Sequence, residues 1–453
     1  MKLCKGEIPA ALTIGGSDSG GGAGIQSDLK TFAAVGVYGT SAITSVTVQN
    51  TLGVMDIWDV DVSIIRRQIK AVAEDIGVDA AKTGMLHTTE IIEAVVEEIS
   101  LWGFPTVVDP LMKPKGGASL MTPGALVTFK EKLIPLAKVV TPNRQEAERL
   151  SGVKVRTLKD AEEAAEEISR LGVEAVVIKG GHIDTPEESV DLLYEDSQVK
   201  TYRLPRLDSK LTHGAGCSFS AAITGLLAKG FDIKEAVERA KRIVFDAIRH
   251  GFDVGKGYGS VNPLAELHLK SEKYAVIMAL EEALEKLNTR DEFFELMPEV
   301  RMNFVYALPR AIDIKEVAGF PGRITFDGKQ LASVSRPRFG VSTHVAKTII
   351  TVMKSFPDIR SALNIKYERD LVDASVKLGL NVLNYDRRLE PEKIRRTEGA
   401  SIPWGVEQAL KELDLRPDII FHLGDIGKEP MITVLAETPR EVLKKVVKVL
   451  KNR

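Results

Sequence analysis

The sequence predicts an α/β fold in which a mainly parallel sheet is flanked by helices and is followed by a second, smaller α/β domain. Short β-branched runs alternate with amphipathic helical segments over residues 1–264. These runs are apolar throughout, as is typical of strands that are buried on both faces of a sheet. A Gly/Ser-rich stretch, residues 255–262, then precedes a second alternating series. The 453 residues are enough for two such domains.

The expected strands of the first half are short, and turn residues end each of them. A strand over 10–14 leads through a glycine-rich loop to a helix over 25–35. A helix over 161–171 follows Thr157, which forms a capping box with Asp160. Three further strands are expected at 106–108, 139–140 and 175–178. Because binding sites of parallel sheets lie beyond the carboxyl ends of the strands, we expect functional residues just after these runs.

The second half also alternates expected strands and helices, but fewer capping and turn residues mark their ends. Its expected elements are a helix over 274–287, a strand over 302–307, a helix over 342–356, strands over 381–385 and 418–422, and a last helix that begins at 438–439. Glu441 stands at the third position of that last helix, as helix starts prefer. We place the boundary near residue 262, with one domain over 1–264 and another over 270–453.

Composition and charge exclude several classes of protein. The net charge of −2 argues against a strongly basic nucleic-acid binder. Two cysteines, Cys4 and Cys217, cannot form a disulfide framework or a four-thiolate zinc site. The seven histidines lack a His-x-x-x-His pair, which argues against a transition-metal site. Apolar runs stay shorter than the ~18 residues that a membrane span needs, so we expect a cytoplasmic protein that binds neither nucleic acid nor membrane.

Two glycine-rich segments can bring the backbone close to a ligand. The first, residues 15–24, follows a strand but lacks the Gly-Lys-Ser/Thr of a P-loop. The second, residues 212–217, opens an apolar helix over 219–227. Its amides and the helix dipole would suit a transferring phosphoryl group, and Cys217 lies in the first turn, where a thiol pKa is lowered. A glycine-rich helix start with a buried cysteine explains the spacing equally well.

Polar residues follow three of the expected strands, and each has two interpretations. Asn143 and Glu146 form either a capping box or a set of ligands for Mg²⁺ beside ATP. Asp109 is either a turn residue or a second carboxylate near that metal. Lys179 is either a solvated side chain or a charge that reaches a nucleotide phosphate.

Together and in this order, these segments resemble the ribokinase-like family of small-molecule kinases. The closer similarity is to its hydroxymethylpyrimidine kinase/phosphomethylpyrimidine kinase branch, which serves thiamine synthesis. The resemblance covers residues 8–264, and its motifs are residues 19–32, 46–51, 82–86, 141–143, 179–182 and 213–217.

The resemblance implies ATP-dependent phosphorylation of an aminopyrimidine alcohol, and then of its monophosphate, with Mg²⁺. The implied residues are Gln49, Asp28, Met85 and Gly16 for the pyrimidine, Lys179 and Thr212 for ATP, Gly214, Ala215 and Gly216 for the γ-phosphate, and Asn143, Glu146 and Asp109 for Mg²⁺. The amide of Gln49 offers the donor and acceptor that an aminopyrimidine edge needs. Ala215 replaces a threonine common in this branch, which the loop should tolerate.

Cys217 stands where most ribokinase-like enzymes have an aspartate base, and the pyrimidine branch also has a cysteine there. Two roles remain open for it, since it either accepts the hydroxymethyl proton or only positions the substrate. The segment 113–117, Lys-Pro-Lys-Gly-Gly, is the expected lid, with a solvated loop as the alternative.

The second half, residues 270–453, resembles the ThiN-type thiamine-phosphate synthase domain. The matching segments are residues 317–324, 338–344, 401–405, 418–422 and 427–430. The resemblance implies that Arg323 and His344 are functional residues. Arg336, Arg338 and Lys428 are candidates for binding phosphate, although a solvated face explains most single arginines equally well.

We therefore expect a bifunctional enzyme of thiamine synthesis, with small-molecule substrates, and we expect it to form a homo-oligomer. In the alternative hypothesis, the second domain senses thiamine phosphates or mediates oligomerisation without catalysis. A kinase for another acceptor, such as pyridoxal or a sugar, is a third hypothesis, and Gln49 and Cys217 argue against it.

Overall fold

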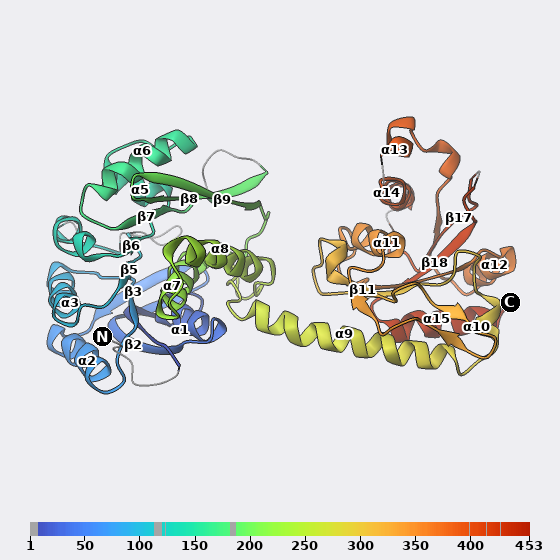
Figure 1. Ribbon diagram of the computed structural model, residues 1–453, viewed down its shortest axis with the longest axis horizontal. Coiled ribbons are helices and arrows are strands. Elements are labelled where there is room, and N and C mark those ends of the chain that lie inside the picture. Colours follow the sequence, from blue (N-terminus) through green and yellow to red (C-terminus); the bar gives the residue numbers. More distant parts are fainter. Residues whose placement is uncertain are drawn as a thin grey trace. The chain divides into compact units, whose positions relative to one another are not determined.

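The computed structural model describes residues 8–112, 120–122, 124–181, 187–397, 399–413, 415–425 and 427–453. The chain forms two compact units, Met1–His268 and Leu269–Arg453. Figure 1 shows both units.

Within the described residues, the first unit holds a nine-stranded sheet in the order β3-β2-β1-β4-β5-β6-β7-β8-β9. The strands are β1 (Ala10–Asp18), β2 (Tyr38–Asn50), β3 (Gly53–Asp59), β4 (Ala80–Thr83), β5 (Thr106–Val108), β6 (Val139–Val140), β7 (Ala175–Ile178), β8 (Glu188–Glu195) and β9 (Gln198–Pro205). The six strands β1, β2 and β4 to β7 run parallel, whereas β3, β8 and β9 are antiparallel to their neighbours. The expected mainly parallel sheet is confirmed.

Helices cover both faces of this sheet. Those of the first unit are α1 (Gly24–Ala34), α2 (Val62–Asp75), α3 (Thr89–Trp102), α4 (Ala125–Thr128), α5 (Arg144–Ser151), α6 (Leu158–Ser169), α7 (Ala215–Ala228) and α8 (Ile233–Arg249). Leu12 and Ile14 of β1 pack with α2, α3, α5 and α6 in one apolar cluster. Residues that alternate with them, such as Ala11, face α1 and α7, and α8 packs farther along the same side.

Local signals account for the elements that the sequence predicts well. The strands β5, β6 and β7 have the expected bounds, and each is fully buried. Thr157 and Asp160 form the expected capping box at the start of α6. β1 extends four residues beyond the expected strand, to Asp18, and carries the first part of the glycine-rich segment into the sheet.

The second unit, within its described residues, holds a seven-stranded sheet in the order β14-β11-β10-β15-β18-β17-β16. Its strands are β10 (Phe304–Ala307), β11 (Val317–Gly319), β14 (Arg338–Phe339), β15 (Ser361–Lys366), β16 (Val382–Asn384), β17 (Ile419–His422) and β18 (Met431–Ala436), and β12 (Thr325–Phe326) pairs with β13 (Leu331–Ala332) apart from them. The sheet is antiparallel except for the β16–β17 pair.

Helices pack on both faces of this sheet as well. They are α9 (Ala265–Leu287), α10 (Glu292–Glu295), α11 (His344–Met353), α12 (Arg369–Lys377), α13 (Glu392–Arg396), α14 (Ser401–Leu413) and α15 (Pro439–Leu450). One core contains residues of α9, α12 and α15, and the other contains residues of α11 and α14. Thr438 caps α15 by accepting a hydrogen bond from the amide of Glu441, as expected.

The expected helix over 274–287 is the second part of the longer helix α9. Asn262 lies just before this helix, and its side chain accepts a hydrogen bond from the backbone amide of Leu264 at 3.2 Å. The division between the two units falls inside this helix, between His268 and Leu269.

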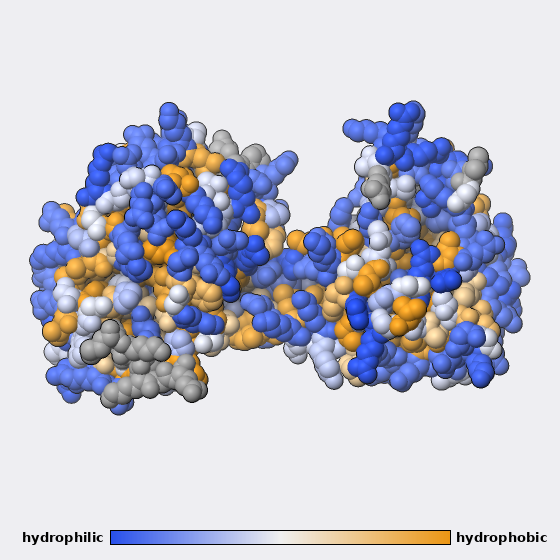
Figure 2. Space-filling view, in the orientation of Figure 1, coloured by the Kyte–Doolittle hydropathy of each residue, from blue (hydrophilic) through white to orange (hydrophobic). Residues whose placement is uncertain are grey.

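The surface shown in Figure 2 is mostly hydrophilic, with apolar residues scattered between polar ones. In the part of the chain that the structure describes, no helix has both the length and the apolar character that crossing a bilayer requires.

Candidate functional site

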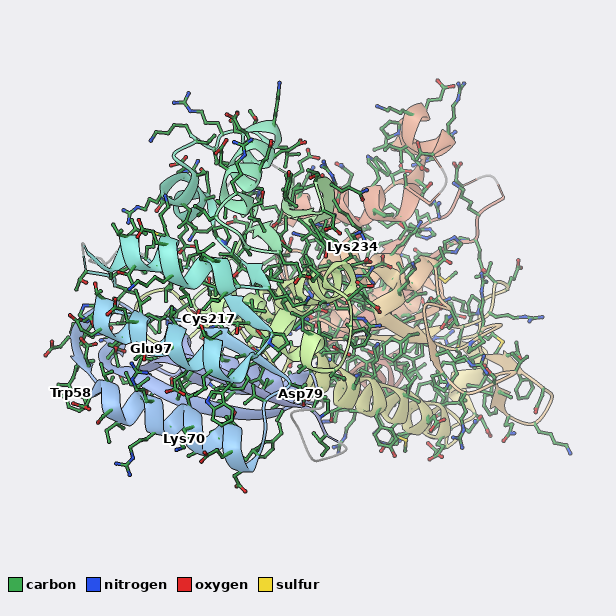
Figure 3. The ribbon with its side chains drawn as sticks, turned by 60° about the vertical axis from the view of Figure 1, so that its left-hand side comes forward. Trp58, Lys70, Asp79, Glu97, Cys217 and Lys234 are labelled. Carbon is green, nitrogen blue, oxygen red and sulfur yellow. The ribbon has the colours of Figure 1, made fainter. Side chains whose placement is uncertain are left out.

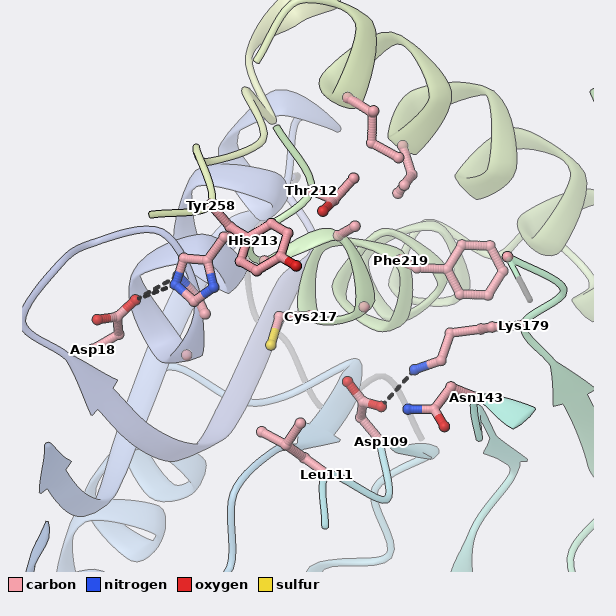
Figure 4. Close-up of a pocket in the computed structure, with 18 of the residues that line it drawn as sticks. Asp18, Asp109, Leu111, Asn143, Lys179, Thr212, His213, Cys217, Phe219 and Tyr258 are labelled. Atoms are coloured by element: carbon pink, nitrogen blue, oxygen red, sulfur yellow. Dashed lines mark hydrogen bonds and ion pairs between the residues drawn. The ribbon is translucent and has the colours of Figure 1, made fainter. Parts of the chain in front are cut away.

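A cavity of about 540 Å³ lies in the first unit, beyond the carboxyl ends of its parallel strands. Its walls come from the ends of β1 and β2, from residues that follow β4 to β7, and from the start of α7. The sequence-predicted residues that line it are Gly16, Gln49, Met85, Asp109, Asn143, Glu146, Lys179, Thr212, Gly214, Ala215, Gly216 and Cys217. Figure 4 shows the central part of this cavity.

The glycine-rich loop is organised by the buried carboxylate of Asp18. This carboxylate accepts hydrogen bonds from the amides of Gly20, Gly22 and Ala23 at 2.8, 3.0 and 2.8 Å. Burial raises the pKa of Asp18, but these amides and His213 outweigh it, so that the pKa lies below its usual value. A charged Asp18 therefore holds the loop in one shape.

The start of α7 approaches this loop closely, and glycines allow the approach. Gly214 has φ of +83°, and a Cβ there would lie 1.8 Å from the carbonyl oxygen of Gly22. No side chain caps the helix, and the amide of Ala215 donates to the carbonyl oxygen of Thr212 at 3.3 Å. The next two amides, of Gly216 and Cys217, have no carbonyl partner among the described residues. These amides and the helix dipole open into the cavity, where an anion would be stabilised.

Cys217 lies in this first turn and is buried, with 6% of its surface exposed. Figure 4 shows its thiol between His213 on one side and Asp109 with Lys179 on the other. Burial raises the pKa of the thiol to about 11, and the charge of Lys82 lowers it less. The expectation of a lowered thiol pKa is therefore wrong, because loss of hydration outweighs the helix start.

Asp28 lies elsewhere than the sequence suggests. It is not among the residues that line the cavity, and only 1% of its surface is exposed. One carboxylate oxygen accepts hydrogen bonds from Thr13 and Lys82, both at 2.7 Å. Asp28 therefore lies behind the wall of the cavity, where its Oδ2 is held by Thr13 and Lys82 and its Oδ1 is buried without a hydrogen-bond partner in the described structure.

Lys82 is the other half of that ion pair, and sequence analysis did not single it out. It is fully buried in β4. Burial lowers its pKa, but Asp28, Cys217 and Asp109 together raise it above the usual value, so the ammonium stays charged. Two features could have identified Lys82 as a site residue: it begins the motif at residues 82–86, and it lies near the carboxyl end of a strand.

Gln49, Met85 and Gly16 form the side of the cavity on which the pyrimidine was expected. The Oε1 of Gln49 accepts a hydrogen bond from Thr47 at 3.2 Å, and its Nε2 lies 3.4 Å from the Nε2 of His213. His213 also contacts the Oδ2 of Asp18 at 3.2 Å. His213 was not predicted as a site residue by itself, although it begins the motif at residues 213–217.

Asn143, Glu146, Asp109 and Lys179 meet on the opposite side. The side-chain oxygen of Asn143 accepts a hydrogen bond from the backbone N–H of Glu146 at 3.0 Å, and the backbone N–H of Asn143 donates to the Glu146 carboxylate at 2.8 Å, which confirms the capping box of α5. Lys179 forms an ion pair with Asp109 at 2.9 Å. Burial raises the pKa of Glu146 to about 7, and the charge of Lys179 offsets this only in part. The capping residues also line the cavity, so the capping box is confirmed, while their role as Mg²⁺ ligands stays a prediction.

The expected lid, residues 113–117, lies outside the described residues. Two further cavity residues, Asp191 and Lys241, were not predicted and form a buried ion pair at 2.9 Å. Asp191 also accepts a hydrogen bond from the amide of Gly180 at 2.8 Å, beside Lys179. The sequence did not predict these two residues because they lie inside β8 and α8, and not in a turn that follows a strand.

The second unit gathers several cationic side chains near Arg323 and His344. Arg323 has φ of +70° and donates a hydrogen bond to the carbonyl oxygen of Val300. His344 is the first residue of α11. Desolvation, together with the charges of Arg323, Arg387 and Lys347, lowers the pKa of His344 below its usual value. Arg323 and His344, which the sequence predicted separately, therefore interact electrostatically in the folded unit.

The three other predicted cations of this unit have different surroundings. Arg336 is 89% exposed at its side chain and lies 3.4 Å from Glu281. Arg338 is exposed on β14. Lys428 lies 3.8 Å from the buried Glu390, and its charge contributes to a low pKa at His422. Of the three, Lys428 is the one that the structure connects to the interior of the unit.

The chain matches a known protein family over most of its first unit. Residues 18–262, more than half of the chain, match the family described as phosphomethylpyrimidine kinase. The chain belongs to the phosphomethylpyrimidine kinase family. Residues 279–448 match a second family, described as thiamine-phosphate synthase ThiN. The resemblance seen for both halves of the sequence is confirmed.

Curated relatives agree with the kinase family. The chain is 47% identical over 259 residues to the hydroxymethylpyrimidine/phosphomethylpyrimidine kinase of Bacillus subtilis, which covers 57% of this chain and 96% of that protein. It is 46% identical over 254 residues to the thiamine biosynthesis bifunctional protein ThiED of Geobacter sulfurreducens, which covers 56% of this chain and 52% of that protein.

Solved structures of related kinases show the fold of the first unit. An ADP complex of Bacillus subtilis pyridoxal kinase is 41% identical, with a TM-score of 0.54, and the match covers 58% of this chain and 99% of that one. Staphylococcus aureus pyridoxal kinase in complex with pyridoxal is 38% identical, with a TM-score of 0.54, over 58% of this chain and 95% of that one. The ribokinase-like fold expected for this kinase family member is confirmed.

Proposed function

We propose that the chain is a bifunctional enzyme of thiamine synthesis. Residues 1–264 phosphorylate 4-amino-5-hydroxymethyl-2-methylpyrimidine with ATP, first to the monophosphate and then to the diphosphate. Residues 270–453 couple this diphosphate to thiazole phosphate, which gives thiamine phosphate and pyrophosphate. The observation that carries the kinase part is the uncapped start of α7, which opens into a cavity between the side of Gln49 and Met85 and the side of Asp109, Glu146 and Lys179.

In the kinase reaction, Gly214, Ala215 and Gly216 hold the γ-phosphate with their main-chain amides, and Lys179 and Thr212 contact ATP. Gln49 pairs with the edge of the aminopyrimidine, and Met85 and Gly16 contact its ring. A protonated Cys217 positions the hydroxymethyl group and is not the base of the free enzyme, since burial raises its pKa. Asp28 supports this site from behind, through Lys82.

Mg²⁺ fits the donor set at the phosphate side. Two buried carboxylates, Asp109 and Glu146, and the amide of Asn143 line one wall, and the high pKa of Glu146 shows that its negative charge lacks full compensation. In the described part of the chain, this site included, no group of three or more His, Cys, Asp or Glu side chains could hold a metal without further ligands. Mg²⁺ commonly takes one or two carboxylates and completes its shell with phosphates and water. When bound with ATP, it would neutralise the charge of the phosphates.

In the synthase reaction, the leaving pyrophosphate needs cations while positive charge develops on the pyrimidine. Arg323 supplies positive charge, and His344, whose low pKa favours the neutral ring, acts as a hydrogen-bond partner. Lys428 is a further candidate cation, whereas Arg336 and Arg338 are exposed. The product of the first unit is the substrate of the second, so one chain supplies both steps.

The decisive experiment supplies the purified chain with hydroxymethylpyrimidine, ATP, Mg²⁺ and thiazole phosphate and identifies the products. Thiamine phosphate and pyrophosphate are expected. His344→Ala and Arg323→Ala should stop thiamine phosphate formation while pyrimidine diphosphate still accumulates. Wild-type synthase rates in both variants would favour the hypothesis that the second unit only senses thiamine phosphates. Pyridoxal belongs in a parallel assay, and its preference over the pyrimidine alcohol would contradict the proposal.

We also propose a homo-oligomer, formed through an apolar face of the β2–β3 hairpin. Val46 and Trp58, which pair across the two strands, are 41% and 68% exposed, and Val48 is 51% exposed. Figure 3 shows Trp58 at the periphery of the first unit, far from the buried Cys217. Because β3 is an edge strand, the same patch on a second copy can cover it symmetrically. Light scattering should give a smaller mass for Trp58→Glu than for the wild type, and equal masses would exclude this interface. The cytoplasmic location and the absence of nucleic-acid binding stay predictions.

A further inference from the structure

The second unit contains a buried arginine without a partner. Arg387 follows β16 in a short turn, and only 9% of its surface is exposed. Within the described residues, its side chain has no hydrogen bond and no ion pair, whereas its neighbour Arg388 is paired with Asp386 at 2.6 Å. A buried guanidinium is costly unless an anion or several acceptors satisfy it. No side-chain nitrogen of Arg387 is among the fully buried polar atoms without a partner, so the guanidinium keeps contact with solvent and is open to an anion from outside the folded chain.

The nearest candidate carboxylate is engaged in another way. Glu390, three residues on, is buried, and its Oε2 lies 3.8 Å from the Nζ of Lys428. Its other oxygen has no partner in the described structure, and no ion pair joins Glu390 to Arg387. The local acid thus balances Lys428, and the charge of Arg387 stays uncompensated.

The sheet places Arg387 at the same end of its strands as Arg323, with four strands between β11 and β16. The pairings of the seven-stranded sheet orient β11, β16 and β17 alike, so their carboxyl ends share one edge. Arg323 follows β11, Arg387 follows β16, and His422 ends β17. Arg387 also lowers the pKa of both His344 and His422, which places its charge near both rings.

The two histidines and a helix start complete the surroundings. The amide of Gly424 donates to Nδ1 of His422 at 3.2 Å, so the proton of the neutral ring is on Nε2, a free donor. The ring of His422 also packs against Tyr385 at 5.3 Å between centroids. The helix α11 begins at His344 with no side-chain cap, so its first-turn amides remain available.

We propose that Arg387, with Arg323 and the start of α11, forms the subsite that binds a phosphoryl anion in the second unit. This inference rests on the proposed synthase function and names the residue that holds the phosphate or diphosphate. An arginine fork suits it, because two parallel N–H groups match two oxygens of a phosphate. The anion comes either from the pyrimidine diphosphate, and hence the leaving pyrophosphate, or from thiazole phosphate.

The test compares Arg387→Met with Arg388→Met in the full chain, by calorimetric titration with inorganic pyrophosphate and with inorganic phosphate. Both variants keep the kinase cavity, so a difference between them belongs to the second unit. Arg387→Met should weaken binding of one anion about 30-fold or more, which is ~2 kcal/mol, and Arg388→Met should not. In synthase assays, a raised KM for the pyrimidine diphosphate or for thiazole phosphate identifies the source.

If Arg387→Met does not fold, Arg387→Lys replaces it in the test. This variant keeps the positive charge but loses the two parallel N–H groups of the guanidinium. It should bind the same anion with an intermediate affinity. If the wild type makes no thiamine phosphate but shows this binding pattern, the subsite stands and the synthase proposal fails. If both Arg387 variants bind both anions like the wild type, the subsite is wrong.

Discussion

A substitution at Gly216 is the most direct test of the proposal that the start of α7 binds the γ-phosphate. A Cβ at this position would lie 3.4 Å from the Nζ of Lys179, in ordinary contact with the end of a flexible side chain. Alanine is therefore tolerated by the geometry, whereas an aspartate would place a carboxylate among the amides that should hold the γ-phosphate.

We expect Gly216→Asp to lower the kinase rate by about 10²–10³-fold, as for loss of an oxyanion site, and Gly216→Ala to stay near the wild type. Steady-state phosphorylation of hydroxymethylpyrimidine measures both, and circular dichroism checks that both variants fold. An unimpaired Gly216→Asp enzyme would remove the start of α7 from the mechanism.

The Cys217 thiol makes a prediction about pH. Its pKa is raised from 9.0 to about 11 by burial, so the unfolded chain loses this proton at a lower pH than the folded chain. The free energy of unfolding should then fall between pH 9 and 11, by up to about 1.4 kcal/mol per pH unit. Urea unfolding of Cys4→Ser, compared with Cys4→Ser/Cys217→Ala, isolates this contribution. A stability that rises over this range only when Cys217 is present would mean that the thiolate is favoured.

At the scale of elements, the Lys82–Asp28 pair joins β4 to α1. The Nζ and Oδ2 atoms lie 2.7 Å apart, and each side chain is 1% exposed. Removing one partner leaves a buried charge without compensation, whereas removing both leaves none.

We therefore expect Lys82→Met to cost about 3–5 kcal/mol of unfolding free energy, and Lys82→Met/Asp28→Leu to cost less. Lys138→Met is the matched control, because its ion pair with Glu174 is largely exposed and should contribute less than about 1 kcal/mol. Urea denaturation of the four proteins measures the differences. Equal losses for the two lysine variants would show that burial of the Lys82 pair is unimportant.

Sequence patterns predicted elements where local chemistry decides them. The strands β5, β6 and β7 are short apolar runs that turn residues end, and their bounds agree with expectation. The strand β9 was not predicted, since its side chains are mostly exposed and carry no clear alternation. Antiparallel β8 depends on pairing with β7, and β9 on pairing with β8, which no local pattern encodes.

Site residues divide in the same way. Motif residues such as Gly214 and Lys179 were predicted because they lie in glycine-rich or strand-end segments of the sequence. Lys82 and Asp28 are 54 residues apart, so their ion pair, and the position of Asp28 behind the cavity, follow from tertiary packing alone. Arg387 was missed although it follows an expected strand, and the rule that located Asp109 would have located it as well.

At the scale of the whole molecule, the two units should be separable. The residues that line the kinase cavity end at Tyr258, before α9 begins. The apolar residues of α9 that are fully buried, among them Val276 and Leu280, belong to the core of the second unit. Each unit therefore contains its own core and its own proposed site.

We expect residues 1–265 alone to fold and to phosphorylate hydroxymethylpyrimidine at the rate of the full chain. Residues 1–250 are the matched control, because this shorter chain lacks the loop that supports the site. In that loop the carbonyl oxygen of Gly259 accepts a hydrogen bond from the amide of His213 at 3.0 Å, and the amide of Gly257 donates to Thr51 at 3.2 Å. The shorter chain should lose activity even where it stays soluble. Kinase assays and thermal unfolding of both compare them, and an inactive or insoluble 1–265 would show that the kinase unit depends on the rest of the chain.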